Sequence, residues 1–432
     1  MTFFFHYLTR TRKRKRRAQR ISSKAQHDAA NDTSIEDLPT HIVIDILSRL
    51  SLKPVLISRC VCKTWNLFIS DPLFIFNNHS TPELFLRTDH STTTCISRTL
   101  HWVDTATGNY HSDLRFNLPQ RYSKYEIVNS CNGFLCLSKS LFKNPSIVCN
   151  PVTGEYVTIP KPQNDPTMTV NVVAAFGYSS KTNHYKVLRL VLCTSFFRIA
   201  ELYTLGTCTT SSSWRRLGFA PLAPIGGLCP TYLNGVIHWA CDDPETCHFI
   251  VAFDFEQECF CVVPPPSHFD AKQKKKENLY YINMGVLGGC LSICDVTCST
   301  HIDIWVMKEY HVQQSWTKQF SIDNCGLCRP IKLVANGDVL LMFCKRQGLA
   351  LYDPVEKNIR YLEIRNAHSI AFQAVTFAPS FVSLRDVVGV DGLKVQNDRS
   401  RFDKCELHEE AETLFLVERN LPEVLLEHLY IW

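Results

Sequence analysis

Cysteine is the residue of this 432-residue chain whose spacing comes nearest to metal chemistry. Cys325 and Cys328 form one Cys-x-x-Cys pair, but no second pair or His-x-x-x-His follows at zinc-finger spacing. Cys290, Cys294 and Cys298 would share one face of a helix, yet the glycines and β-branched residues around them favour a strand. The sequence therefore predicts no metal site and no cofactor.

The 20 cysteines fall mostly within apolar runs, where a thiol behaves as a small hydrophobic side chain. No apolar run approaches the roughly 20 residues needed to span a bilayer. The apolar first residues precede the positive charges, which is the reverse of a secretory signal. We therefore expect an intracellular protein without a membrane partner, and reduced thiols in place of disulfides.

Catalytic motifs are not found in the sequence. It contains no nucleophile elbow, His-Glu-x-x-His, phosphate-binding loop or dinucleotide-binding glycine pattern. His238, His248 and His301 lie in or near β-like segments, but their spacing does not mark them as metal ligands. We therefore expect no catalytic residues in this chain.

Positive charge is concentrated between Arg10 and Arg20, which hold eight basic residues and no acid. Removing eight charges from the net +5 leaves −3 for the rest, so nucleic acid is not expected as a partner. Residues 1–33 lack periodicity and are expected to form a disordered tail. The run is either a solvated tail or a nuclear import signal, which would place the protein in the nucleus and the cytoplasm. The candidate signal consists of Arg12, Lys13, Arg14, Lys15, Arg16 and Arg17.

Residues 34–76 are predicted to form three short helices. Ile42, Ile46 and Leu50 recur every four residues, and Pro54 can begin a second helix. About 40 residues cannot enclose a core that uses all of these apolar side chains. Part of the apolar surface must therefore face either the rest of the chain or the helical groove of a partner.

Residues 81–384 show a β pattern with an internal repeat. Asn-Gly pairs at Asn132, Asn234 and Asn336 are spaced by 102 residues, and Gly288 lies 54 residues after the second pair. The unit of about 51 residues matches a four-stranded propeller blade of the kelch kind, so the segment predicts about six blades. The tryptophans of these strands are expected in the blade cores, at Trp214, Trp239, Trp305 and Trp316. The fold class is thus α+β multidomain, a small all-α domain followed by an all-β propeller-like domain.

The last segment, 385–432, turns polar and then reads as a tail with short helices. Leu421-Pro422 separates two amphipathic pieces that could dock on the propeller. The sequence predicts no function for them.

These residues resemble a known family. Leu38-Pro39, Ile46-Leu47 and the phrase SRCVCKTW resemble the F-box motif. The β segment is similar to the F-box-associated domain of a family expanded in plants. The matching phrases, in the family's order, are CNGFLCL, NPVTGEYVTIP, FGYSSKTNHYKVLRL, SWRRLG, LNGVIHWA, VAFDFEQECFCVVPPP, LGGCLSICD, IDIWVMKEY and SWTKQFSI.

The resemblance implies a non-catalytic substrate receptor of an SCF-type ubiquitin ligase. Its F-box would bind a Skp-type adaptor and through it cullin and RING subunits, and the β domain would bind an unidentified target protein. The implied adaptor-binding residues are Leu38, Pro39, Ile42, Ile46, Leu47, Leu50, Pro54, Cys60, Val61, Cys62 and Trp65. Some of them, Trp65 among them, could instead hold the three helices together.

Two other classes stay open. One is a propeller that binds peptides or glycans without ubiquitin transfer. The other is a propeller enzyme of the galactose-oxidase type, which would need a cluster of His and Tyr ligands on one face. Target specificity is expected in the loops at one rim of the propeller, because loops carry function without a sequence signature.

Overall fold

A computed structural model gives the arrangement of the chain, which divides into two compact units at residues 1–49 and 50–432. Several positions named in the sequence analysis lie outside the described residues. They are the basic run between Arg10 and Arg20, and Asn336, Cys325, Cys298 and His248. The structure describes residues 38–50, 52–71, 74, 82–88, 99–103, 105, 111–112, 114–117, 125–139, 144–162, 169–193, 198–206, 214–220, 230–240, 250–267, 282–295, 301–323, 328–334, 339–344, 348–365, 372–389, 393–397 and 414–419.

Three short helices occur where the sequence predicts them. Helix α2 (Thr40–Ser48) lies in the first unit and begins directly after Pro39. Helices α3 (Leu52–Ser58) and α4 (Lys63–Ser70) belong to the second unit. The Sγ atom of Cys62 accepts a hydrogen bond from the Trp65 amide at 3.4 Å, which satisfies a free N–H at the start of α4.

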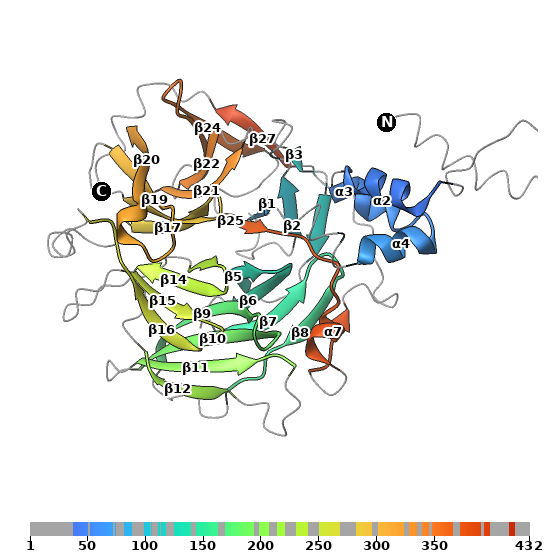
Figure 1. Ribbon diagram of the computed structural model, residues 1–432, viewed down its shortest axis with the longest axis horizontal. Helices are drawn as coiled ribbons and strands as arrows, with labels where there is room; N and C mark the ends of the chain where they lie inside the picture. The colour runs from blue at the N-terminus through green and yellow to red at the C-terminus, as the bar shows by residue number, and fades with distance from the viewer. Residues whose placement is uncertain are drawn as a thin grey trace, which may run out of the picture. The chain divides into compact units, whose positions relative to one another are not determined.

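The remainder of the second unit is a six-bladed β-propeller, as the repeat predicts (Figure 1). Blade 1 consists of β1 (Glu83–Thr88), β2 (Thr99–Val103), β4 (Leu114–Asn117) and β25 (Phe372–Phe377). Blade 2 consists of β5 (Tyr125–Cys131), β6 (Phe134–Lys139), β7 (Pro145–Asn150) and β8 (Glu155–Thr158), with β26 (Gln396–Asn397) at its edge. Blade 3 consists of β9 (Thr169–Ser179), β10 (His184–Cys193), β11 (Arg198–Thr204) and β12 (Arg215–Phe219).

The other three blades follow the same antiparallel order. Blade 4 consists of β13 (Thr231–Leu233), β14 (Val236–Ala240), β15 (Ile250–Asp254) and β16 (Cys259–Val263). Blade 5 consists of β17 (Ile282–Leu287), β18 (Cys290–Asp295), β19 (His301–Met307) and β20 (Trp316–Asp323), with a 3-10 turn η4 (Gln313–Ser315) before β20. Blade 6 consists of β21 (Cys328–Val334), β22 (Val339–Cys344), β23 (Gly348–Asp353) and β24 (Asn358–Arg365), extended by β27 (Leu414–Arg419) and β3 (His111–Ser112).

The ring is closed by a strand from the far end of the propeller sequence. Strand β25 pairs antiparallel with β1, so that Phe377 lies opposite Glu83 and Phe372 lies opposite Thr88. The rings of Phe85 and Phe377 meet edge to face with their centroids 5.0 Å apart. This pairing makes blade 1 from both ends of the propeller sequence and joins them through backbone hydrogen bonds.

Repeated turns account for the periodicity of the sequence. Asn132 and Gly133 have φ angles of 46° and 84°, and Asn234 and Gly235 have 48° and 83°, as a tight hairpin turn requires. These turns join the first and second strands of blades 2 and 4. At the turn after the third strand of blades 2, 4 and 6, an Oδ1 atom accepts two backbone N–H bonds, at Asn150, Asp254 and Asp353.

The tryptophans pack in or against the hydrophobic cores of the blades, as the sequence predicts. Trp239, Trp305 and Trp316 are buried, and Trp214 is half-buried. The indole N–H of Trp214 donates to the carbonyl of Pro160, and that of Trp316 donates to the carbonyl of Pro264, each at 2.8 Å. Trp214 directly precedes the fourth strand of blade 3 and Trp316 begins the fourth strand of blade 5, so each bond joins the start of a fourth strand to the chain just after the fourth strand of the preceding blade.

Two expectations are wrong. Cys328 and Cys344 form a disulfide, because they lie directly opposite each other on β21 and β22 with their Cα atoms 4.2 Å apart. Residues 414–419, expected in a helical tail, form strand β27, which pairs with the outer edge of β24. Helix α7 (Leu384–Val388) follows β25, and the last 13 residues, 420–432, lie outside the described residues.

Candidate functional site

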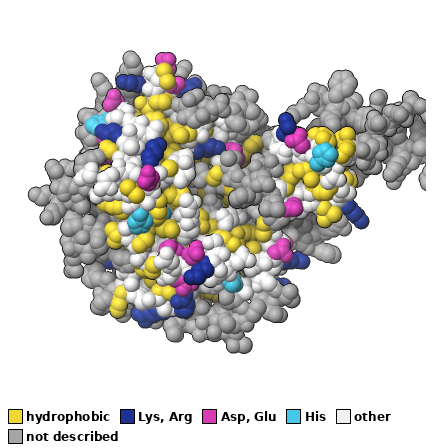
Figure 2. Space-filling model, in the orientation of Figure 1, with side chains coloured by type: hydrophobic (Ala, Val, Ile, Leu, Met, Phe, Trp, Pro, Cys, Tyr) yellow, Lys and Arg dark blue, Asp and Glu magenta, His cyan; other side chains and the backbone are white. Residues whose placement is uncertain are grey.

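An exposed apolar row runs along helix α2. Leu38, Ile42 and Ile46 keep 39%, 39% and 41% of their surface exposed, whereas Val43 and Leu47 are buried. A spacing of four residues places Ile42 and Ile46 on one face of α2. Leu38 lies two residues before the helix, and these three exposed residues are called the stripe. Hydrophobic side chains are visible over the helices in Figure 2. This stripe is the unpaired apolar surface that the sequence predicts.

The other predicted adaptor-binding residues are exposed to different degrees. Cys60 and Val61 are exposed between α3 and α4, and Leu50, Pro54 and Cys62 are half-buried. Pro39 is exposed, and Trp65 is 92% buried. Leu47 is likewise buried.

Two exposed apolar residues of the helices were not predicted. Ile57 on α3 is 40% exposed and Leu67 on α4 is 70% exposed. Their sequence signal is weak, because neither belongs to a four-residue recurrence like that of α2. Together with Val61, they give the second unit exposed apolar surface of its own.

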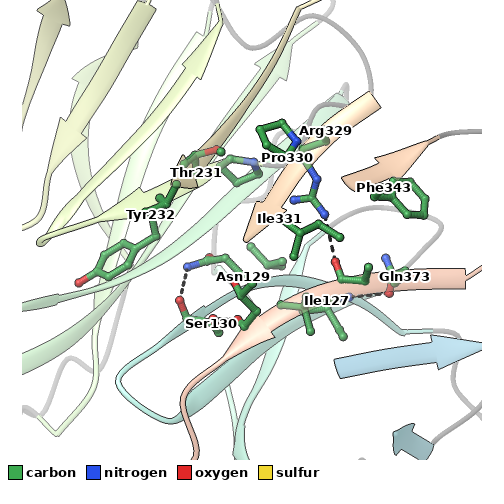
Figure 3. A pocket seen from close by; sticks show the side chains of 17 residues that line it. Ile127, Asn129, Ser130, Thr231, Tyr232, Arg329, Pro330, Ile331, Phe343 and Gln373 are labelled. Atoms are coloured by element: carbon green, nitrogen blue, oxygen red, sulfur yellow. Dashed lines mark hydrogen bonds between the residues drawn. The ribbon is translucent and has the colours of Figure 1, made fainter. Parts of the chain in front are cut away.

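The centre of the propeller holds a second candidate site, a cavity of about 210 Å³ (Figure 3). Its lining comes from the first strands of blades 2, 4, 5 and 6, from the closing strand β25, and from Phe343 on β22. The lining residues are Ile127, Val128, Asn129, Ser130, Pro230, Thr231, Tyr232, Gly285, Val286, Arg329, Pro330, Ile331, Phe343, Gln373, Ala374, Val375 and Thr376.

Hydrogen bonds between blades hold this lining in place. The Gln373 side-chain oxygen accepts from the amide of Ile127 at 3.2 Å, and the Ser130 hydroxyl donates to the Thr376 carbonyl at 2.7 Å. Asn129 donates to the Phe176 carbonyl at 2.7 Å and accepts from the amide of the same residue at 2.9 Å. The cavity is therefore bounded by fixed strands of several blades.

The histidines in the described segments do not form a metal cluster. The ring of His238 is fully buried, and its Nδ1 and Nε2 lie 3.1 Å from the Thr231 carbonyl and 2.7 Å from the Tyr310 hydroxyl. The Nε2 atom of His301 lies 3.8 Å from the Oδ2 atom of Asp303 on the same strand. Within the described ranges, no group of three His, Cys, Asp or Glu side chains could hold a metal ion. No helix in these ranges is long and apolar enough to cross a membrane.

Family comparison assigns both parts of the chain. The F-box associated beta propeller domain matches residues 86–384, and the F-box domain matches residues 35–77. F-box protein At3g07870 of Arabidopsis thaliana is 28% identical over 378 residues, covering 74% of this chain and 86% of the relative. F-box/kelch-repeat protein At3g23880 of the same plant is 26% identical, covering 82% and 98%. The chain thus belongs to the F-box proteins that carry an F-box associated beta propeller domain.

Proposed function

We propose that this chain is the substrate-receptor subunit of an SCF-type ubiquitin ligase. The F-box docks a Skp-type adaptor, which connects to cullin and RING subunits, and the propeller binds the target protein. In such an assembly a conjugating enzyme carries ubiquitin on its own cysteine. The chain itself then needs to hold a target and an adaptor, and it supplies no catalytic residue.

The apolar stripe of α2 is the observation that carries the adaptor assignment. Ile42 and Ile46 on α2, and Leu38 just before it, each keep about two-fifths of their surface exposed, whereas the other face of the helix is buried. A helix of nine residues is marginal alone in water, and apolar anchors on helices bind apolar grooves of partners. A helical partner surface would remove this stripe from water.

The combination of domains supports the receptor role. The F-box and the propeller match separate parts of one chain, and the relatives that align with most of that chain are named as F-box proteins. A closed propeller with a stable ring presents loops on a rigid frame, which suits recognition of a target.

Adaptor binding tests the proposal. Ile42→Ala and Ile46→Ala together remove two exposed side chains while keeping strong helix formers on α2. If the stripe is the interface, loss of about 2 kcal/mol or more should weaken adaptor affinity at least roughly thirtyfold. The measurement is calorimetric titration of the purified chain with a Skp-type adaptor.

Val355→Ala is the matched control, because Val355 is 83% exposed in the propeller turn after β23. It should leave adaptor affinity within twofold of the unsubstituted chain. If the double variant and the control bind the adaptor with equal affinity, the stripe is not part of the adaptor interface. A chain that binds no adaptor at all would favour a propeller that binds peptides or glycans without ubiquitin transfer.

A further inference from the structure

Among the described residues that line the central cavity, one side chain is charged. Arg329 on β21 extends toward β25, where its Nη2 donates to the Ala374 carbonyl at 3.0 Å (Figure 3). A guanidinium carries five N–H donors and no acceptor. No Asp or Glu is among the lining residues that the structure describes, so no carboxylate of the cavity wall neutralises this charge.

The rest of the lining is divided between apolar and uncharged polar groups. Val286, Ile331 and Phe343 contribute apolar surface, while Thr231 and Gln373 contribute polar atoms. Figure 3 places Ile331 beside Arg329 and Gln373 below it, with Thr231 on the other side of the cavity. A ligand held here would therefore meet one positive charge and an apolar wall.

The volume of the cavity limits the size of such a ligand. The cavity measures about 210 Å³, whereas an apolar cavity of about 150 Å³ is large enough to hold benzene. A single ring with a short acidic substituent fits within this volume, and a larger drug-sized molecule does not.

We propose that the central cavity binds a small carboxylate with an apolar body, whose carboxylate pairs with Arg329. Arginine is suited to this contact because its planar fork can donate two parallel hydrogen bonds to one carboxylate. The apolar body would lie against Val286, Ile331 and Phe343. The ligand would bridge inner strands of several blades, because the lining comes from all of them.

The same chemistry could be supplied by a free metabolite or by the terminal carboxylate of a target polypeptide. In the first case the binding stands independently of the proposed receptor function. In the second case it rests on that function and defines part of the target. We argue for the free molecule, because about 210 Å³ suits a single ring with one carboxylate, whereas a polypeptide could place no more than its last residue inside.

Paired probes test the proposal on the full chain bound to its adaptor, or on the full chain alone if no adaptor binds. Phenylacetate and phenylacetamide have the same shape and differ in charge, so the acid should bind at least about tenfold more tightly, which corresponds to 1.4 kcal/mol. Affinities are measured by ligand-observed NMR titration up to about 10 mM, well above the affinity expected for a fragment. A short peptide with a free C-terminal Phe, beside its amidated form, tests the polypeptide source.

Substitutions then locate the contact. Arg329→Gln should bring acid and amide to within twofold of each other. Arg216→Gln, on the exposed outer strand of blade 3, removes the same charge and should leave the tenfold ratio unchanged. Val286→Phe fills the cavity while keeping Arg329, and should weaken binding of both probes.

Several results would overturn the proposal. These are no saturable binding of phenylacetate, equal affinity for acid and amide, or a tenfold ratio that persists in Arg329→Gln. If Arg329→Gln fails to fold, Arg329→Lys and Val286→Phe decide the question, because unchanged binding in both would remove the cavity as the site. Binding of the peptide acid without binding of phenylacetate would reject the free molecule. Adaptor affinity measured separately, by titrating the same chain with purified adaptor, distinguishes these failures from failure of the proposed function.

Discussion

The Nε2 atom of His238 lies 2.7 Å from the hydroxyl of Tyr310, and this contact joins strand β14 of blade 4 to the turn before η4 in blade 5. Nδ1 of the same ring lies 3.1 Å from the Thr231 carbonyl, which can only accept a hydrogen bond. The neutral ring with its proton on Nδ1 satisfies both contacts, because the Tyr310 hydroxyl then donates to Nε2. Burial lowers the pKa of His238 to about 4, from an ordinary value of 6.5.

Stability should depend on pH through this ring. Between pH 6.5 and 4 the unfolded chain binds a proton at His238 and the folded chain does not, so folding becomes weaker as pH falls through this range. The neutral His238 ring contributes about 3 kcal/mol to the unfolding free energy above pH 6.5, and this contribution should be lost by about pH 4. Denaturant unfolding of the unsubstituted chain and His238→Gln at several pH values measures it. The gap in unfolding free energy between them should shrink toward pH 4, and parallel curves would contradict the assignment.

The segment after β25 should stabilise the hairpin of blade 2. A Cβ added to Gly133 would overlap the Cβ of Ser380, whereas a Cβ added to Gly289 meets no atom within 4 Å. Both glycines have positive φ, so alanine at either costs roughly 1–2 kcal/mol, and Gly133→Ala should cost about 1–3 kcal/mol more. Adding Ser380→Gly should recover most of the excess, because it removes the overlapping Cβ atom. Equal unfolding free energies for the two single variants would show that the segment does not pack there.

The disulfide of blade 6 should contribute to stability under oxidising conditions. It closes a loop with a sequence separation of 16 residues, for which chain entropy predicts about 3 kcal/mol. Cys328→Ser with Cys344→Ser should lower the unfolding free energy by that amount without reductant. Reductant should lower the stability of the unsubstituted chain to that of the variant. An unfolding free energy that is unchanged by reductant would show that the disulfide does not form in solution.

Local patterns predicted a large part of the architecture. The Asn-Gly turns at Asn132 and Asn234 depend on the backbone freedom of their own residues, and the exposed stripe of α2 follows from a recurrence within one helix. Local sequence therefore specified both the blade repeat and the apolar face.

Long-range contacts could not be predicted in the same way. Arg329 reaches the cavity because β21 and β25 come together when the ring closes, and no local pattern distinguishes it from an arginine on an outer strand. The pairing of Cys328 with Cys344 depends on the register of β21 and β22. Strand β27 forms because β24 offers an edge from a distant part of the sequence.

Nuclear import is proposed for the basic run, which lies outside the described residues. Replacing residues 12–17 with alanine removes six positive charges from this run. A fluorescent fusion of the full chain should then shift from the nucleus to the cytoplasm. Quantified nuclear and cytoplasmic fluorescence checks this, and an unchanged distribution would leave the run as a solvated tail.

The half-lives of captured proteins test the receptor account most directly. Proteins captured by both the unsubstituted chain and the variant with Ile42→Ala and Ile46→Ala are identified first, and their decay is then followed in cells that carry either form or neither. The account predicts that the unsubstituted chain shortens the half-life of at least one shared protein. The variant, which holds the same protein but binds the adaptor at least roughly thirtyfold more weakly, should leave that half-life near or above its value in cells without either form. Equal decay of every shared protein with both forms would contradict the account.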